Sequence, residues 1–138
     1  QPVLSIPFTR PEHVLAASLN AERWADLAGH VYTPQLFLFA PGSITGKTQF
    51  HGRLLSFEQA RDAVPPIGSV MPEFIAYLAE QADVSNGTHT FSIDRGSLTT
   101  RKSILHAEFD KRAGRALRCR LGGNVIKIGR GELFFPFE

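Results

Sequence analysis

The stretch "GSVMPEFIAYLAEQ", residues 68–81, decides the fold. Gly68 and Ser69 form a turn in which Ser69 is placed to cap a helix, and the pattern predicts that helix over Val70 to Gln81. Its apolar residues point in nearly every direction around the helix axis: Val70, Met71, Phe74, Ile75, Ala76, Tyr77, Leu78 and Ala79. A helix that is apolar all round is buried all round. Other elements of this small chain are therefore expected to enclose it.

Short runs rich in β-forming residues, separated by Gly, Asn and Asp, fill most of the remaining chain. Upstream of the helix they span residues 2–8, 36–40 and 47–57, with two short helices expected over 9–19 and 21–29. Downstream they span residues 88–94, 103–110, 116–123, 124–129 and 131–137. This order predicts an α+β fold, in which a mainly antiparallel, barrel-like sheet wraps around one central helix.

A glycine-bearing loop, "APGSITGKTQF" at residues 40–50, invites comparison with a phosphate-binding P-loop. That motif needs four residues between its first glycine and the Gly-Lys pair, but only three separate Gly42 from Gly46. The residues after Lys47 also favour extended chain over the required helix. The stretch is therefore interpreted as a loop between two strands, with Lys47 in solvent.

Length and composition exclude several classes of protein. With 138 residues, 43% hydrophobic and 20% charged, the chain is predicted to be one domain over residues 1–138. A formal net charge of +2 argues against a nucleic-acid footprint, and no apolar run is long enough for a membrane span. The lone Cys119 allows no internal disulfide, which fits a reducing, cytoplasmic compartment, and its alternating flanks predict a small core residue.

Several motifs occur in the order seen in the second lobe of the PhzF-like (phenazine biosynthesis) family. "FLFAPG" resembles the strand before that family's motif loop, and "VPPIGSV" (residues 64–70) occupies the motif position. "FIAYLAEQ" resembles the helix that follows, "TTRKSIL" supplies Arg101 and Ser103, and "LGGNVIKIGRGELFF" resembles the ending. The resemblance covers most of this chain and about half of a family member. It implies the diaminopimelate-epimerase fold, with two β-barrel lobes around central helices and the active site between them.

The resemblance fails at the family's chemistry. Aligned on Gly68 and Ser69, the family's aspartate falls on Val64, and the nearest carboxylate is Asp62. The family's catalytic glutamate and its partner histidine belong to the first lobe, which has no counterpart here. The proton-transfer machinery implied by the resemblance is therefore incomplete in one copy of this chain.

Five residues are the candidate site. The amides of Gly68 and Ser69 at a helix start suit a substrate carboxylate, although a plain turn and cap is the alternative. The candidate catalytic acids or bases are Asp62, Glu73 and His51. Alternatively, Asp62 is an ordinary loop residue and Glu73 only complements the helix dipole. The alternative for His51 is a histidine that faces solvent from a strand. The five histidines show no metal-ligand spacing, so neither a metal nor a cofactor is predicted.

Three functions stay open at this point. The first is a cofactor-independent, PhzF-like isomerase that moves a proton on a small carboxylate-bearing metabolite, this chain supplying one lobe. The second is a non-catalytic carboxylate-binding lobe that has lost the acid–base residues. The third is a dimerisation domain without a ligand. The complementary lobe would come from a homodimer mate or from a separate N-terminal chain, and a dimer or heteromeric contact is therefore expected.

Overall fold

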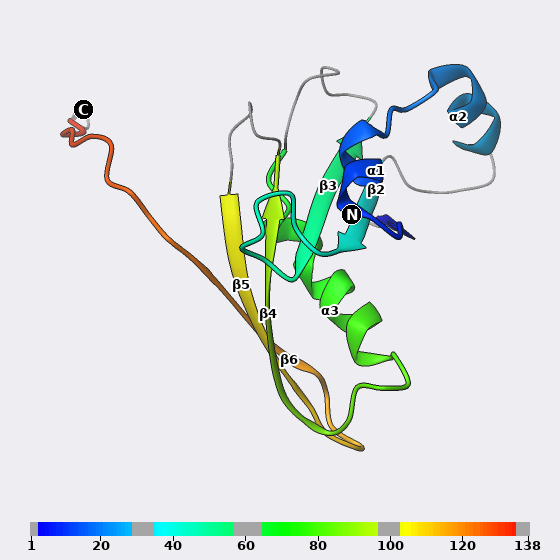
Figure 1. Ribbon diagram of the computed structural model, residues 1–138. Coiled ribbons are helices and arrows are strands. Elements are labelled where there is room, and N and C mark those ends of the chain that lie inside the picture. Colours follow the sequence, from blue (N-terminus) through cyan, green and yellow to red (C-terminus); the bar gives the residue numbers. More distant parts are fainter. Residues whose placement is uncertain (1–2, 29–34, 57–64, 97–102, 135–138) are drawn as a thin grey trace, which may run out of the picture.

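The computed structural model describes residues 3–28, 35–56, 65–96 and 103–134, and they fold as a six-stranded sheet with a few helices (Figure 1). The strands are β1 (Leu4–Pro7), β2 (Gln35–Pro41), β3 (Phe50–Ser56), β4 (Gly87–Arg95), β5 (Ser103–Lys111) and β6 (Arg118–Gly123). The helices are α1 (Pro11–Ala16), α2 (Ala21–Ala28), the 3-10 turn η1 (Gly68–Val70) and α3 (Met71–Ala79). The α+β class is confirmed.

The strands lie in chain order, from β1 at one edge to β6 at the other. β2–β3, β4–β5 and β5–β6 are antiparallel, whereas β1–β2 and β3–β4 are parallel. The β3–β4 junction is short, because only Phe50 with Ile93 and His51 with Asp94 are in register. We call this junction the seam: it joins one three-stranded half, β1–β3, to another, β4–β6.

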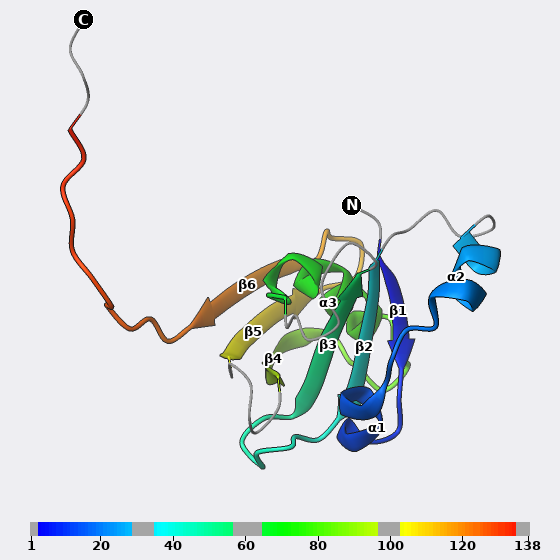
Figure 2. The same ribbon diagram turned by 90° about the horizontal axis from the view of Figure 1, so that it is seen from above.

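Helices cover both faces of the sheet around β2, whose residues from Leu36 to Ala40 are all buried (Figure 2). Alternate side chains of a strand point to opposite faces. Phe37 and Phe39 belong to the core beneath α3, and Leu36, Leu38 and Ala40 to a second core with Val14 and Trp24 from α1 and α2. The continuous apolar run in this strand therefore reflects burial on both sides.

The central helix forms where it was predicted, but its burial is one-sided. Phe74 and Ile75 are fully buried against the sheet, whereas Ala76 is exposed and Tyr77 keeps 37% of its surface in solvent. In the described residues the sheet is open, so enclosure of the helix by a barrel is not confirmed. Packing on one face of the sheet is enough to bury the apolar side of the helix. Ala76 exposes little apolar surface, and Tyr77 packs edge-on against Phe39 beside the helix.

Phe74 is the centre of the larger core. Its ring lies 4.7–5.6 Å, centroid to centroid, from the rings of Phe37, Phe39, Phe50 and Phe91. Those four residues come from β2, β3 and β4, so one side chain of α3 packs across the seam. Beside the seam Gly52 has no side chain, and a Cβ there would lie 2.9 Å from Ile93 Cδ1 and 3.0 Å from the Phe37 ring.

Three local predictions are wrong. Ser69 makes no capping hydrogen bond, because it lies inside η1, which precedes α3 and leaves Val70 at the cap position. Cys119 is exposed, because it lies in the edge strand β6, whose residues are all exposed. The strands expected over 124–129 and 131–137 do not form in the described residues up to 134, where no neighbouring strand offers them hydrogen bonds.

Substitutions on the two sides of α3 test its one-sided packing. Phe74→Ala should lower the free energy of unfolding by about 3–5 kcal/mol through lost burial and a cavity among the rings. Ala76→Gln should change it by less than about 0.5 kcal/mol, because the side chain enters water. Urea unfolding followed by circular dichroism measures both. A large loss from Ala76→Gln would show instead that the helix is enclosed.

Candidate functional site

A buried pair of polar side chains, His51 and Asp94, lies on the seam. The imidazole Nδ1 of His51 is 2.6 Å from Oδ1 of Asp94, and the two side chains are only 1% and 5% exposed. They are the second registered pair between β3 and β4, so the sheet itself brings them together. Phe50 and Ile93 point toward α3, so the alternation of side chains turns His51 and Asp94 to the opposite face of the sheet. Helix α1 packs on that same opposite face.

The β2–β3 loop closes over this pair. Oγ of Ser43 donates to Oδ2 of Asp94 at 2.8 Å, and Oγ1 of Thr45 donates to the same oxygen at 3.1 Å. Positive φ angles at Gly42 and Gly46 shape the loop on either side of these residues, and Lys47 is exposed as expected. The loop is thus no phosphate cradle; its hydroxyls hold a carboxylate.

Asp94 is ionised in this setting. Burial by itself would raise the pKa of its carboxyl group, but the hydrogen bonds from His51, Ser43 and Thr45 and the charge of His51 together bring that pKa below its ordinary value of 3.8. An ionised carboxylate only accepts hydrogen bonds, so Nδ1 of His51 carries the proton between them. The carboxylate thereby fixes both the tautomer and the orientation of the imidazole.

The other ring nitrogen of His51 has no partner. Among the described residues, Nε2 is the buried side-chain nitrogen or oxygen that lacks a hydrogen bond. An imidazole held by a carboxylate at Nδ1, with Nε2 free, is the arrangement of a general acid or base. Ser43 bonds the carboxylate and not the imidazole, so the arrangement does not activate Ser43 as a nucleophile.

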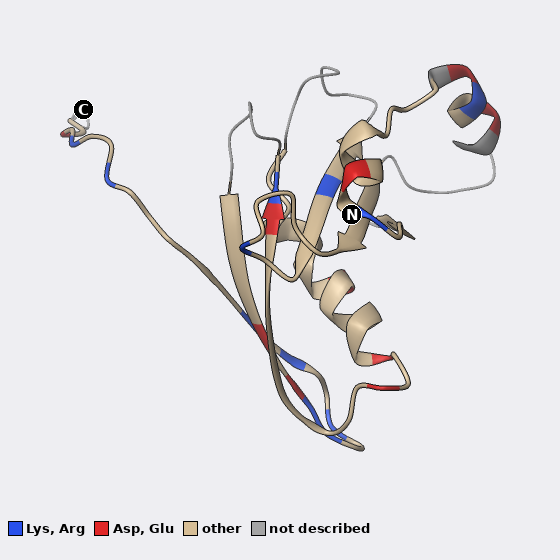
Figure 3. Cartoon of the chain, in the orientation of Figure 1, with Lys and Arg blue, Asp and Glu red and all other residues tan. Residues whose placement is uncertain are grey.

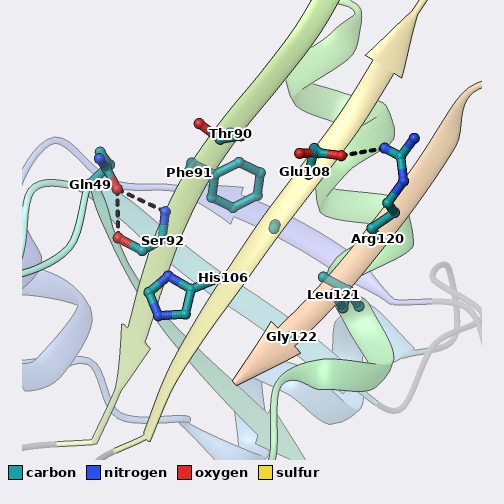
Figure 4. Close-up of a pocket in the computed structure, with 10 residues that line it drawn as sticks. Gln49, Thr90, Phe91, Ser92, His106, Glu108, Arg120, Leu121 and Gly122 are labelled. Atoms are coloured by element: carbon teal, nitrogen blue, oxygen red, sulfur yellow. Dashed lines mark hydrogen bonds and ion pairs between the residues drawn. The ribbon is translucent and has the colours of Figure 1, made fainter. Parts of the chain in front are cut away.

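An open hollow of about 480 Å³ lies along the same face, over β4, β5 and β6 (Figure 4). It is lined by Gln49, Thr90, Phe91, Ser92, His106, Ala107, Glu108, Arg120, Leu121 and Gly122. Oε1 of Gln49 accepts hydrogen bonds from the amide and the hydroxyl of Ser92, at 2.7 and 2.6 Å. Gln49 precedes His51 by two residues, and Ser92 precedes Asp94 by two. The Gln49 side chain and Ser92 therefore lie between the hollow and the His51–Asp94 pair.

Those predicted site residues that the structure describes do not lie together. Gly68 and Ser69 lie in η1 and Glu73 is exposed in the first turn of α3, on the face opposite His51. On the α3 side of the sheet, Nη1 of Arg95 at the end of β4 donates to the carbonyl oxygen of Pro65 at 3.3 Å. Asp62, Val64 and Arg101 lie outside the described residues. Their catalytic or binding roles, like that of His51, stay predictions.

Two parts of the site were missed from the sequence. Asp94 is 43 residues from His51, and nothing in either strand indicates that they pair. Ser43 and Thr45 were considered only as P-loop residues. The sequence gives no clear signal for Asp94, because β4 (GTHTFSIDR) is mostly polar and its alternation with Phe91 and Ile93 predicts a solvent-facing side for this carboxylate.

Comparisons with known proteins give one distant relation. The chain is 21% identical, over 136 residues, to an uncharacterized isomerase of Mesorhizobium japonicum. The match covers 96% of this chain and 45% of that protein, so the chain spans about half the length of the curated relative it matches. No protein-family profile and no solved structure matches. The relation weakly suggests an isomerase family; the narrower PhzF-like resemblance stays a prediction.

Two further features of the described residues bear on function. No helix among them is long and apolar enough to cross a membrane. No three His, Cys, Asp or Glu side chains among them gather closely enough to hold a metal ion.

Replacing Asp94 tests the energetics of the pair. At pH 7, Asp94→Asn should lower the free energy of unfolding by about 1–3 kcal/mol, because it removes a charged acceptor of several hydrogen bonds. A carboxyl group whose pKa is lowered by folding stabilises above its unfolded-state pKa. The deficit should therefore be full above about pH 4 and shrink as the pH falls through the folded-state pKa.

Chemical denaturation of both proteins between pH 2 and pH 7 measures this deficit. The matched control is Asp83→Asn, because Asp83 is an exposed loop carboxylate. A deficit that does not depend on pH, or one no larger than that of the control, would contradict the assignment of Asp94 as the ionised partner.

Proposed function

We propose that this chain is one lobe of a PhzF-like isomerase, which transfers a proton on a small carboxylate-bearing metabolite without a cofactor. The relation to a protein named as an isomerase supports the reaction class. The order of the motifs supports the family, and with it the diaminopimelate-epimerase type of two-lobed architecture and an active site between the lobes.

The observation that carries this proposal is the His51–Asp94 pair. Proton transfer at carbon needs a base of suitable strength at a fixed position, in surroundings that exclude water. His51 supplies the nitrogen Nε2, Asp94 orients it, and the Ser43–Thr45 loop keeps the carboxylate in place. His51 is therefore the preferred catalytic residue among the three candidates, ahead of the exposed Glu73 and of Asp62.

Substrate binding is proposed at the amides of Gly68 and Ser69. A Cβ at Gly68 would meet nothing within 4 Å, so a ligand has room to approach the backbone there. No side chain caps η1 or α3, and the N–H groups of a helix start favour an anion. The substrate would have to extend past the end of β4 to reach both these amides and His51.

A non-catalytic carboxylate-binding lobe is the alternative. It is favoured by Val64 at the family's aspartate position and by the shielding of Nε2, which is buried in this chain. In that case the His51–Asp94 pair acts only in the structure, by joining the two halves of the sheet and fixing the loop over them.

Hydrogen exchange at substrate carbon separates the two functions. A proton-transfer enzyme exchanges a carbon-bound hydrogen of its substrate with D2O, which proton NMR detects as a lost signal across a panel of small carboxylates. His51→Asn should slow this exchange by about 10²- to 10⁴-fold. Asparagine keeps a donor near the position of Nδ1, so the bond to Asp94 survives while Nε2 is lost.

The matched control is His13→Asn, at an exposed histidine of α1, which should leave the exchange unchanged. Binding of a carboxylate without exchange, by the wild-type chain alone or assembled, would favour the non-catalytic lobe. Equal rates for His51→Asn and the wild-type chain would remove His51 from the mechanism.

The complementary lobe is proposed to cover the segment that follows β6. Val125, Ile126, Ile128, Leu133 and Phe134 are 82–96% exposed in this segment. Burial of each such side chain is worth about 2 kcal/mol. The segment continues an edge strand with unpaired backbone groups, so strand addition by a homodimer mate or by a separate N-terminal chain would bury it.

Sedimentation velocity tests this surface. The wild-type chain should associate with itself, or with a co-expressed N-terminal lobe, and Ile126→Lys with Ile128→Lys should weaken that association at least tenfold. Lys127→Gln, which changes the same segment without placing a charge on its apolar residues, is the control. A wild-type chain that stays monomeric at about 100 μM and captures no such lobe would count against the assembly.

A further inference from the structure

The tip of the β5–β6 hairpin carries a concentration of positive charge (Figure 3). From Glu108 to Arg120 there are five basic and two acidic residues, which leaves ten basic and eleven acidic residues in the rest of the chain. The net charge of +2 is therefore unevenly distributed: this hairpin is strongly positive, and the rest of the chain is slightly negative. A uniform solvated surface would not show this asymmetry.

Three of these arginines border one hollow. Arg112, Arg115 and Arg118, together with Asp110 and Ala116, line a depression of about 380 Å³. The hairpin geometry produces it: the amide of Arg115 bonds the carbonyl of Arg112, Gly114 has a φ of +69°, and Arg118 is in register with Asp110. The turn thus brings together guanidinium groups from just after β5, from the tip and from the start of β6.

Unlike Arg120, these three arginines have no close carboxylate partner, and Arg112 acts on Asp110 through its charge alone. Arg120 bonds Glu108 and Asp110, and Thr88 also donates to Asp110, so the two carboxylates of the hairpin are already engaged. Within the described residues, Arg112, Arg115 and Arg118 make no side-chain hydrogen bond or ion pair. Their charges repel one another, and an anion between them would relieve that repulsion.

We propose that the Arg112–Arg115–Arg118 hollow binds a compact oxyanion with two or more negative charges. Guanidinium groups bind planar or tetrahedral oxyanions through paired N–H donors, and three of them suit a multivalent anion better than a single carboxylate. The hairpin tip lies at the other end of β4 and β5 from the His51–Asp94 seam, so this site is separate from the proposed catalytic one (Figure 1). The proposal does not depend on the isomerase function.

Titration with pyrophosphate and with citrate, followed by amide NMR shifts, tests the site and compares phosphate with carboxylate chemistry. Both anions should shift the amides of residues 111–119 with saturation, while sodium chloride at the same ionic strength should not. Arg115→Gln and Arg118→Gln should each weaken binding about five- to tenfold, and the double variant should abolish it. Arg23→Gln, at an exposed arginine of α2, should leave the affinity unchanged.

Two results would overturn the proposal. Equal shifts from chloride and from the multivalent anions would show general screening of a charged hairpin without a site. Saturable shifts at Gly68 and Ser69, with none in the hairpin, would assign anion binding to the start of α3. These substitutions lie on exposed residues, so folding should persist, and an unchanged amide spectrum away from the hairpin verifies it.

Discussion

The fold depends on how the two halves of its sheet are joined. β3 and β4 share only two registered residue pairs, too few to hold six strands in one sheet by backbone hydrogen bonds alone. On one face Phe74 of α3 packs against rings from β2, β3 and β4. On the other face the His51–Asp94 bond crosses the same junction. Apolar packing and a charged hydrogen bond thus act on opposite sides of one seam.

The sequence predicted the elements better than their environment. β-forming runs and turn residues predicted ranges that overlap all six strands, because these signals are local. The apolar circumference of residues 70–81 predicted a helix correctly but overstated its burial, since Ala76 and Tyr77 tolerate solvent at the rim of a sheet. The strands expected after Gly123 have the right composition and no partner among the described residues. Composition gives strand propensity, but pairing needs a neighbour.

The candidate site shows the same division. His51 was singled out because the stretch QFHGR shortly precedes the loop at residues 64–70, and this is local information. Its partner Asp94 was not found, because the pairing of β3 with β4 is parallel and joins residues 43 positions apart. Ser43 and Thr45 were missed for a related reason: their hydroxyls matter through a carboxylate from a distant strand. A single sequence contains no period or spacing that reports such a contact.

The brevity of the seam also has a mechanical consequence. A local separation of the two half-sheets would leave each antiparallel ladder intact, and it would break the packing of Phe74 across the seam. Such a separation would remove Asp94 from Nδ1 and admit solvent to Nε2 in the same movement. The position of the His51 imidazole and the relative motion of the two halves are thereby coupled, because the bond that orients the ring also joins the two half-sheets.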